Sequence, residues 1–301
     1  MAKIAEELKG ESAQSDTLTA RSLAQGDGWA VSDILCTAGP RHRPFEEQHS
    51  CTTIAIVIGG TFQYRSRAPR ELMTPGSFLL GNPGQSFECG HEHGIGDRCI
   101  SFSYRPEFFE RLTADAGACG GASKFKAQRL PPIGALTPLV ARASAALCGY
   151  ADAPWEGLSI GLAAQAIQLD RGLSPHVVEA QPAALARVTR VVRMIERHPE
   201  IRHDLPSLAR EARLSPYHFL RTFEILTGTT PHQYLLRVRL RRAAVRVSAE
   251  TTKILDIALD CGFGDVSNFN RTFRAEFGVS PLVYRAGRQS FFGTKRIYVR
   301  P

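Results

Sequence analysis

The sequence lacks any long hydrophobic run and any regular cysteine framework. No segment approaches the roughly 18 consecutive apolar residues that a membrane-spanning helix needs, and the first ten residues hold no apolar stretch behind their charges. We therefore expect neither a signal peptide nor a membrane span. The seven cysteines are odd in number and scattered irregularly from Cys36 to Cys261. This usage is typical of a protein of the reducing cytoplasm rather than of a disulfide-linked secreted domain.

Acidic residues become scarce in the C-terminal third of the chain. Residues 1–184 hold 16 lysines and arginines against 19 aspartates and glutamates, whereas residues 185–289 hold 18 against 10. The last segment, 289–301, is a basic tail with Lys295, Arg296 and Arg300. The net charge of +8 therefore belongs to one part of the chain. Such an asymmetry indicates either a polyanionic partner such as nucleic acid or a solvated basic surface.

An internal repeat decides between these alternatives. Seven residues recur at a constant offset of 50, and upstream the pattern continues at an offset of 49, pairing Ala209 with Ala258 and Leu214 with Phe263. The second copy therefore has one extra residue before its second helix. A short helix, a turn and another helix, occurring twice, predict a tandem helical module. The seven pairs are Phe219/Phe269, Arg221/Arg271, Thr222/Thr272, Phe223/Phe273, Gly228/Gly278, Pro231/Pro281 and Tyr234/Tyr284.

Each copy has the local signals of a helix-turn-helix. In the first, Ser215 is a good N-cap and Pro216 a good first helical residue, because both suit the unpaired groups of a helix start. Phe219, Phe223 and Leu226 then form one apolar stripe. We expect Gly228 to end this helix in a left-handed conformation.

A helix connects the two copies. Thr230 and Gln233 have the spacing of a capping box, and the apolar pattern continues towards Val247. About 17 residues would span about 25 Å at 1.5 Å per residue. This length suits a spacer that places two recognition helices in successive major grooves, which lie about 34 Å apart.

The second copy forms one long motif. Its members are Ile257, Ala258, Phe263, Gly264, Asp265, Asn268, Phe269, Arg271, Phe273, Phe277, Gly278, Ser280, Pro281, Tyr284 and Arg285. On this motif, residues 185–288 resemble the double helix-turn-helix DNA-binding domain of the AraC/XylS family of bacterial transcription regulators. The resemblance covers about a third of the chain. It implies sequence-specific binding to double-stranded promoter DNA.

The resemblance also implies which residues contact DNA, and they lie opposite the apolar stripes. Arginine can bind guanine through two acceptors, and valine can pack on a thymine methyl group. Leu220 departs from the polar residue expected at its position. For Arg221 and Arg271 the alternatives are a phosphate contact or an ion pair within the domain. The predicted set is Tyr217, His218, Leu220, Arg221, Val266, Ser267, Asn270, Arg271 and Arg274.

Residues 1–130 predict short strands between Gly/Pro turns, for example from Thr52, after Pro75-Gly76 and from Ile100. They resemble the cupin-like sensor domain that precedes the DNA-binding domain in this family. We therefore expect an α+β protein with an N-terminal cupin-like β-barrel and flanking helices. The apolar pattern predicts helices at about 134–149 and 155–171. The resemblance implies that they form a dimerisation or relay segment at 131–173, and simple packing on the barrel is the alternative. Residues 174–184 are the expected linker.

One cluster in the sensor domain has ligand chemistry: Cys89, His91, His93, Asp97 and Cys99. Imidazole and thiolate groups suit zinc or iron. However, in metal-binding cupins the histidine pair comes before the Pro-x-Gly turn, and here it follows that turn. The neighbouring glycines also favour a loop. The cluster therefore predicts either metal or thiol sensing, or a loop or effector-pocket role without metal.

Together these features predict a regulator, not an enzyme, that needs no cofactor. The cupin-like part lacks a complete ligand set in the expected order, and two unequal recognition helices argue against a DNA-binding protein without sequence preference. The expected partners are promoter DNA, RNA polymerase, an unidentified small-molecule effector bound in the barrel, and a second copy of the chain. Effector binding would change how the two helices reach adjacent grooves.

Overall fold

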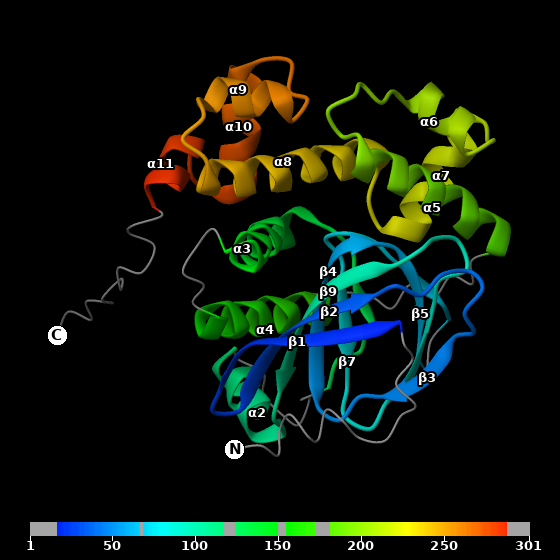
Figure 1. Cartoon of the computed structure of the whole chain (residues 1–301), viewed down its shortest axis with the longest axis vertical. Coiled ribbons are helices and arrows are strands. Elements are labelled where there is room, and N and C mark those ends of the chain that lie inside the picture. Colours follow the sequence, from blue (N-terminus) through cyan, green and yellow to red (C-terminus); the bar gives the residue numbers. More distant parts are fainter. Residues whose placement is uncertain (1–16, 67–68, 117–123, 150–154, 173–180, 288–301) are drawn as a thin grey trace.

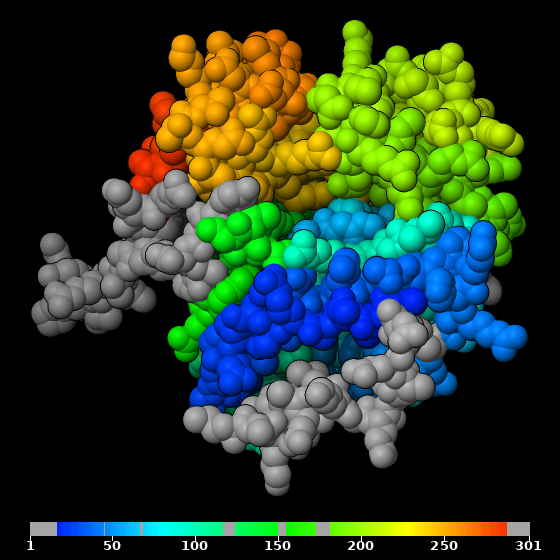
Figure 2. Space-filling view, viewed as in Figure 1, coloured from blue at the N-terminus to red at the C-terminus, as the bar shows by residue number. Residues whose placement is uncertain are grey.

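A computed structural model describes residues 17–66, 69–116, 124–149, 155–172 and 181–287. Strands fill the N-terminal half and helices the C-terminal half, and the helical part lies along one side of the strands (Figure 1). In the space-filling view the helical part forms two lobes (Figure 2). The α+β class predicted from the sequence is thus confirmed. Residues 174–180 of the predicted linker and the predicted basic tail at 289–301 lie outside the described residues.

The strands form two antiparallel sheets. The four-stranded sheet runs in the order β3 (Phe45–Gln48), β8 (Ser86–Gly90), β5 (Phe62–Arg65) and β6 (Glu71–Met73). The six-stranded sheet runs in the order β1 (Leu18–Gly26), β2 (Trp29–Cys36), β9 (Asp97–Tyr104), β4 (Thr52–Gly60), β7 (Phe78–Gly81) and β10 (Arg129–Leu130). The strands predicted from Thr52, after Pro75-Gly76 and from Ile100 correspond to β4, β7 and β9.

The predicted β-barrel is open rather than closed. A barrel needs hydrogen-bonded strand pairs all the way round, and no pair among the described strands joins the two sheets. The chain passes from one sheet to the other where β4 ends at Gly60, whose φ of 77° favours glycine. A Cβ at this position would overlap the backbone oxygen of Gly96. The result is an open, two-layered cupin-like unit.

Among the described residues, the helices that accompany the sheets are α2 (Pro106–Asp115), α3 (Thr137–Leu147) and α4 (Trp155–Gly172), with a short 3-10 turn at Gly134–Leu136 before α3. Apolar residues of α4 join the core of the six-stranded sheet through Leu158 and Leu162. Helix α3 contacts both α4 and the helical domain, as Figure 1 shows. The sequence predicted α3 and α4 but not α2. In the part of the chain that is described, no helix has the length and apolar character to cross a membrane.

The helical domain starts inside the predicted linker, because α5 begins at Pro182. Its seven helices are α5 (Pro182–Arg197), α6 (Leu205–Glu211), α7 (Pro216–Thr227), α8 (Pro231–Ala249), α9 (Ile254–Asp260), α10 (Val266–Phe277) and α11 (Pro281–Ala286). Helices α6 and α7 form the first helix-turn-helix unit, and α9 and α10 form the second. Helix α8 joins the two units.

The two helix-turn-helix units have the spacing that the sequence repeat predicted. Helix α9 starts 49 residues after α6, and α10 starts 50 residues after α7. The extra residue therefore lies in the turn, at 261–265 against 212–215. Ser215 caps α7, and Gly228 ends that helix with a φ of 74°. Asp265 caps α10, and Gly278 ends it with a φ of 76°.

Helix α8 is longer than the sequence indicated. It has 19 residues, which correspond to about 28 Å at 1.5 Å per residue. The capping box is present in both directions: the Thr230 side chain accepts a hydrogen bond from the Gln233 backbone, and the Gln233 side chain accepts one from the Thr230 backbone. The two units are thus joined by one continuous, well-capped helix.

The turn between the paired helices requires a left-handed residue in both units. Arg213 has a φ of 53°, and Gly262, its counterpart at the offset of 49, has a φ of 89°. A Cβ at position 262 would lie 2.8 Å from the Cα of Glu200 and 2.9 Å from the guanidinium of Arg239. The second unit therefore depends on glycine at this position, whereas the first accommodates arginine.

We predict that Gly262→Ala lowers the free energy of unfolding by about 1–2 kcal/mol, because an L-residue is strained at this φ and has no space for its Cβ. Gly264→Ala is the matched control, since a Cβ there enters open space, and we expect it to change stability by less than about 0.5 kcal/mol. Chemical denaturation of the full chain measures both. Equal effects of the two substitutions would contradict this account of the turn.

Candidate functional site

The DNA-binding residues predicted from the sequence lie on the outer faces of α7 and α10. Seven of the nine are exposed: Tyr217, His218, Arg221, Ser267, Asn270, Arg271 and Arg274. The other two, Leu220 and Val266, are half-buried. Behind this face, Phe219, Phe223, Phe269 and Phe273 are fully buried and pack in two aromatic pairs. The buried stripe therefore fixes which side of each helix is available to a ligand.

The arginines of these faces are free of acidic partners. The side chains of Arg221 and Arg274 form no hydrogen bond or ion pair with any residue that the structure describes, and the Arg271 side chain donates one hydrogen bond, of 3.1 Å, to the Asn268 side chain. The sequence left three possible roles for Arg221 and Arg271: a base contact, a phosphate contact or an ion pair within the domain. The structure gives no support for the ion pair. Base or phosphate contacts remain for both Arg221 and Arg271.

The first recognition helix presents rings as well as charge. Tyr217 is 69% exposed, and its ring contacts that of His218 with centroids 5.9 Å apart. The Ser215 hydroxyl accepts a hydrogen bond from the backbone of His218 at 3.4 Å. The start of α7 is therefore ordered by its own cap. Because Leu220 is half-buried, the hydrogen-bonding groups of this face come from its neighbours.

The arginines of α8, in contrast, are engaged inside the molecule. Arg239 donates to the backbone oxygens of Pro199 and Ile201 at 2.6 and 2.9 Å. Arg241 pairs with Glu196 at 3.2 Å. Arg246 pairs with Glu250 and Asp260. Because these cations are already partnered, we interpret α8 as a support for the two units, whereas the recognition helices carry arginines without acidic partners.

Arg237 of α8 joins three parts of the protein. Its Nη1 donates to the backbone oxygen of Pro132, in the sensor half, at 3.1 Å and to Thr229 Oγ1, after the first unit, at 2.9 Å. Its Nε lies 3.5 Å from Glu276 of the second unit. Glu276 also accepts a hydrogen bond of 2.6 Å from Thr137 of α3. Burial lowers the pKa of Arg237, and the Glu276 charge opposes this effect.

The sensor half also contributes apolar contacts to both units. Leu72 of β6 belongs to the core of the first unit, and Ala141 of α3 belongs to the core of the second. Arg129 donates a hydrogen bond of 3.2 Å to the backbone oxygen of Leu226 near the end of α7. Sequence reasoning missed these contacts and the Arg237 junction. No local signal could have found them, because the hydrogen bonds between the two halves join residues 97 to 139 positions apart.

The structure separates the members of the predicted Cys/His cluster. Strand β8 ends at Gly90, so His91 and His93 lie in a loop, as the glycines indicated. His91 and Asp97 lie together with Cys36, a residue that the sequence did not suggest, and their potential ligand atoms are all within 4.8 Å of one another. His93 instead lies against α5.

The two remaining cysteines flank this group. The Cys99 thiol donates to Asp97 Oδ2 at 3.4 Å. Burial raises the pKa of the Cys99 thiol well above its usual value, and the Asp97 charge adds to the effect. Burial likewise raises the pKa of the Cys89 thiol. Both thiols therefore stay protonated at neutral pH, whereas a metal ligand or a reactive cysteine is a thiolate.

His91 and Asp97 form a buried ion pair with a separation of 2.5 Å between Nε2 and Oδ1. Burial alone would lower the pKa of His91, but hydrogen bonds to Asp97 and Cys36, and the charges of these groups, raise it to about 9. In a tetrahedral site with bonds of about 2.0–2.1 Å, two ligand atoms lie about 3.3 Å apart. The arrangement therefore fits a proton shared by the pair better than it fits a metal.

Two family descriptions match the chain: a helix-turn-helix domain over residues 208–287 and an AraC-like ligand-binding domain over residues 35–167. The matches correspond to the two helix-turn-helix units and to the two-layered sheet domain, in the order of the AraC/XylS family. The chain belongs to the AraC/XylS family. Its AraC-like ligand-binding part includes the His91–Asp97 pair, and its helix-turn-helix part includes both recognition helices.

Curated relatives match over the DNA-binding part. The HTH-type transcriptional activator RhaS of Klebsiella pneumoniae is 45% identical over 64 residues, which is 21% of this chain and 23% of that protein. The HTH-type transcriptional regulator Rv1931c of Mycobacterium tuberculosis is 35% identical over 83 residues, 28% of this chain and 32% of that protein. The chain thus spans about a quarter to a third of the length of these relatives.

Solved structures match with low TM-scores. The DNA-binding domain of AdpA in complex with a target DNA is 31% identical, covers 34% of this chain and 91% of that chain, and gives a TM-score of 0.33. ToxT from Vibrio cholerae is 12% identical, covers 88% of this chain and 100% of that chain, and gives a TM-score of 0.36.

We predict that the His91–Asp97 pair makes the ligand-binding domain pH-sensitive. A histidine whose pKa rises from about 6.5 to about 9 on folding stabilises the native state fully below pH 6.5, and this contribution is lost as the pH rises through 9. When the pH rises from about 6.5 to 9.5, the free energy of unfolding should therefore fall in both proteins by different amounts. The fall should be roughly 2–3 kcal/mol larger in the wild type than in His91→Gln.

Chemical denaturation at several pH values measures this difference, with His232→Gln, at an exposed position of α8, as the control. A wild-type profile identical to that of His91→Gln would show that the pair does not titrate as described. Metal analysis of the purified protein and of His91→Ala tests the alternative from the sequence. A stoichiometric metal ion that disappears in the variant would establish a metal site there.

Proposed function

We propose that the protein is a sequence-specific transcription regulator that binds promoter DNA through α7 and α10. The observation that carries this proposal is the arrangement of two exposed recognition faces at the two ends of α8. Arg221 on the first face, and Arg271 and Arg274 on the second, have no acidic partner among the described residues. The helix of about 28 Å is of the order of the 34 Å between successive major grooves. Two recognition helices held in this way can contact adjacent grooves on one side of a duplex.

The residues of each face have distinct proposed roles. Arg221 and Arg271 bind guanine edges, since arginine donates two hydrogen bonds to the O6 and N7 acceptors. Ser267 and Asn270 make more permissive base contacts, and the half-buried Val266 packs on a thymine methyl group. In the first unit Tyr217 and His218 add hydrogen-bonding groups beside Leu220. Arg274, one turn after Asn270, completes the face of the second unit.

The proposal includes control by an effector. The AraC-like ligand-binding domain contacts both units through the Arg237 junction, so a ligand that favours one arrangement of the sensor half changes the relative placement of the two recognition faces. The protein would act in the cytoplasm, as a homodimer, in contact with RNA polymerase, and without enzymatic activity. Ile160 of α4 is an apolar residue that is 40% exposed, and we propose the dimer contact at this position.

We predict that Arg271→Ala weakens binding to the cognate duplex by about 1–3 kcal/mol and relaxes the base preference at one position. The cognate duplex is selected from a randomised pool with the wild-type protein, and affinities are measured at one fixed salt concentration. Arg105→Ala, an exposed arginine before α2 in the sensor half, is the charge-matched control and should leave the affinity unchanged.

Two other outcomes would contradict parts of the proposal. An equal loss of affinity for selected and random duplexes would make Arg271 a phosphate contact rather than a base contact. A wild-type protein that selects no sequence from the pool would be an architectural DNA-binding protein, and the proposed function would be wrong.

A further inference from the structure

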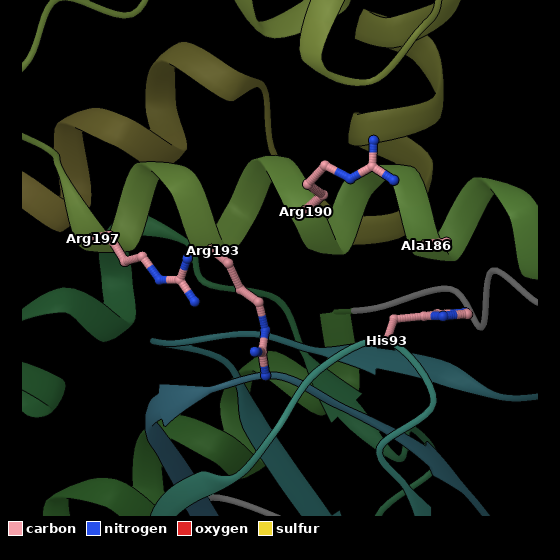
Figure 3. A pocket seen from close by; sticks show the side chains of 5 residues that line it. All are labelled: His93, Ala186, Arg190, Arg193 and Arg197. Atoms are coloured by element: carbon pink, nitrogen blue, oxygen red, sulfur yellow. The ribbon is translucent and has the colours of Figure 1, made fainter. Parts of the chain in front are cut away.

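One face of α5 carries a row of arginines, of which Arg193 and Arg197 extend towards the sensor half and Arg190 extends away from it (Figure 3). Ala186, Arg190, Arg193 and Arg197 recur at intervals of four, three and four residues, which places them on one side of the helix. Together with His93 from the loop between β8 and β9 they line a cleft of about 380 Å³ (Figure 3). The cleft thus lies between the ligand-binding domain and the DNA-binding domain.

The positive charge of this cleft is only partly compensated. Arg190 lies 3.9 Å from the Glu211 carboxylate. Arg193 donates to Thr61 Oγ1 at 3.0 Å and to the Ile95 backbone oxygen at 3.2 Å, which are neutral groups. Neither Arg193 nor Arg197 forms an ion pair with any of the described residues. Two guanidinium groups at the cleft therefore lack a counter-charge.

The nearby carboxylates are already engaged elsewhere. Glu92 pairs with Arg70 at 2.7 Å, and its other oxygen lies 4.0 Å from His93. Asp97 is bound to His91. Burial lowers the pKa of Arg193, the like charge of Arg197 lowers it further, and the charge of Asp97 opposes both effects. An additional anion in the cleft would relieve this repulsion.

A second, independent feature points into the same region. Four buried polar atoms here have no hydrogen-bond partner: both side-chain amide atoms of Gln63, the hydroxyl of Thr189 and Nε2 of His93. Gln63 is only 4% exposed and Thr189 only 2%. The three residues line a small hollow of about 10 Å³ next to the cleft, and His93 borders both. The hollow itself has room for about one water molecule. Because unpartnered buried polar groups are costly, the Gln63 amide nitrogen and the Thr189 hydroxyl, both hydrogen-bond donors, favour an acceptor beside the cleft.

We propose that the cleft between α5 and the β8–β9 loop binds a small oxyanion, a carboxylate or a phosphate group, and that this anion is recognised by Arg193, Arg197 and His93. Arginine suits both groups, because its planar fork matches their paired oxygens. The proposal rests on the proposed effector-responsive function and names its ligand class. It places the effector between the two domains rather than inside the sheet domain, where the sequence suggested it.

The position of the site gives the ligand a means of control. Arg193 already joins α5 to Thr61 and to Ile95 of the sensor half, and its guanidinium packs against Gly94, where a Cβ would overlap it. An anion that binds the α5 arginines and His93 together favours the docked arrangement of the two domains. The anion shifts the equilibrium between docked and undocked domains only to the extent that it binds the docked arrangement more tightly than the undocked one.

The test uses isothermal titration calorimetry of the full chain with inorganic phosphate and, separately, with malonate, at constant ionic strength. We expect one anion per chain, and we expect Arg193→Gln and Arg197→Gln each to weaken its binding at least tenfold. Arg187→Gln is the matched control, because this residue lies on the same helix but does not line the cleft. The ratio of the two affinities distinguishes a carboxylate site from a phosphate site.

Two results would overturn the proposal: no binding of either anion to the wild type, or equal binding by the wild type and both arginine variants. Arg197 is exposed, so loss of binding in Arg197→Gln does not reflect unfolding. Affinity for the selected duplex is measured in the same preparations. A wild type that recognises its duplex but binds neither anion refutes only this inference, whereas failure of duplex selection refutes the proposed function itself.

Discussion

The arrangement of the molecule depends on one buried guanidinium. Arg237 lies in the middle of α8, its side chain is only 15% exposed, and it contacts the sensor half, the end of the first unit and the second unit at the same time. A buried cation is stable only when its hydrogen-bonding groups are satisfied, so the three partners must stay in place together. The placement of the two recognition helices is therefore coupled to the segment around Pro132.

This coupling acts at one end of each recognition helix. The C-terminal ends of α7 and α10 are held by sensor-half residues: Arg129 binds the backbone of Leu226, and Thr137 binds Glu276. The predicted DNA contacts begin near the opposite, N-terminal ends, where Tyr217 and Ser267 are exposed. A shift of the segment between β10 and α3 would thus move both recognition faces without touching them. The arginine-lined cleft at α5 adds a second contact between the same two domains.

Local features of the fold could be predicted from the sequence because they depend on neighbouring residues. The cap at Ser215, the capping box at Thr230 and the left-handed glycines are set by short-range hydrogen bonds and backbone sterics. Features that join distant segments could not be predicted. Cys36 lies beside Asp97 only through the pairing of β2 with β9, and the barrel proved open because the described strands of the two sheets do not pair. The α5 cleft likewise exists only once both domains are folded.

The junction at Arg237 can be tested most directly by hydrogen exchange of the full chain and of Arg237→Gln. If this arginine holds the three parts together, amide exchange should become faster simultaneously in residues 129–137 and at the C-terminal ends of α7 and α10, while the core strand β9 stays protected. Faster exchange confined to α8 itself, or no change at all, would contradict the central claim that one buried side chain couples the sensor half to both recognition helices.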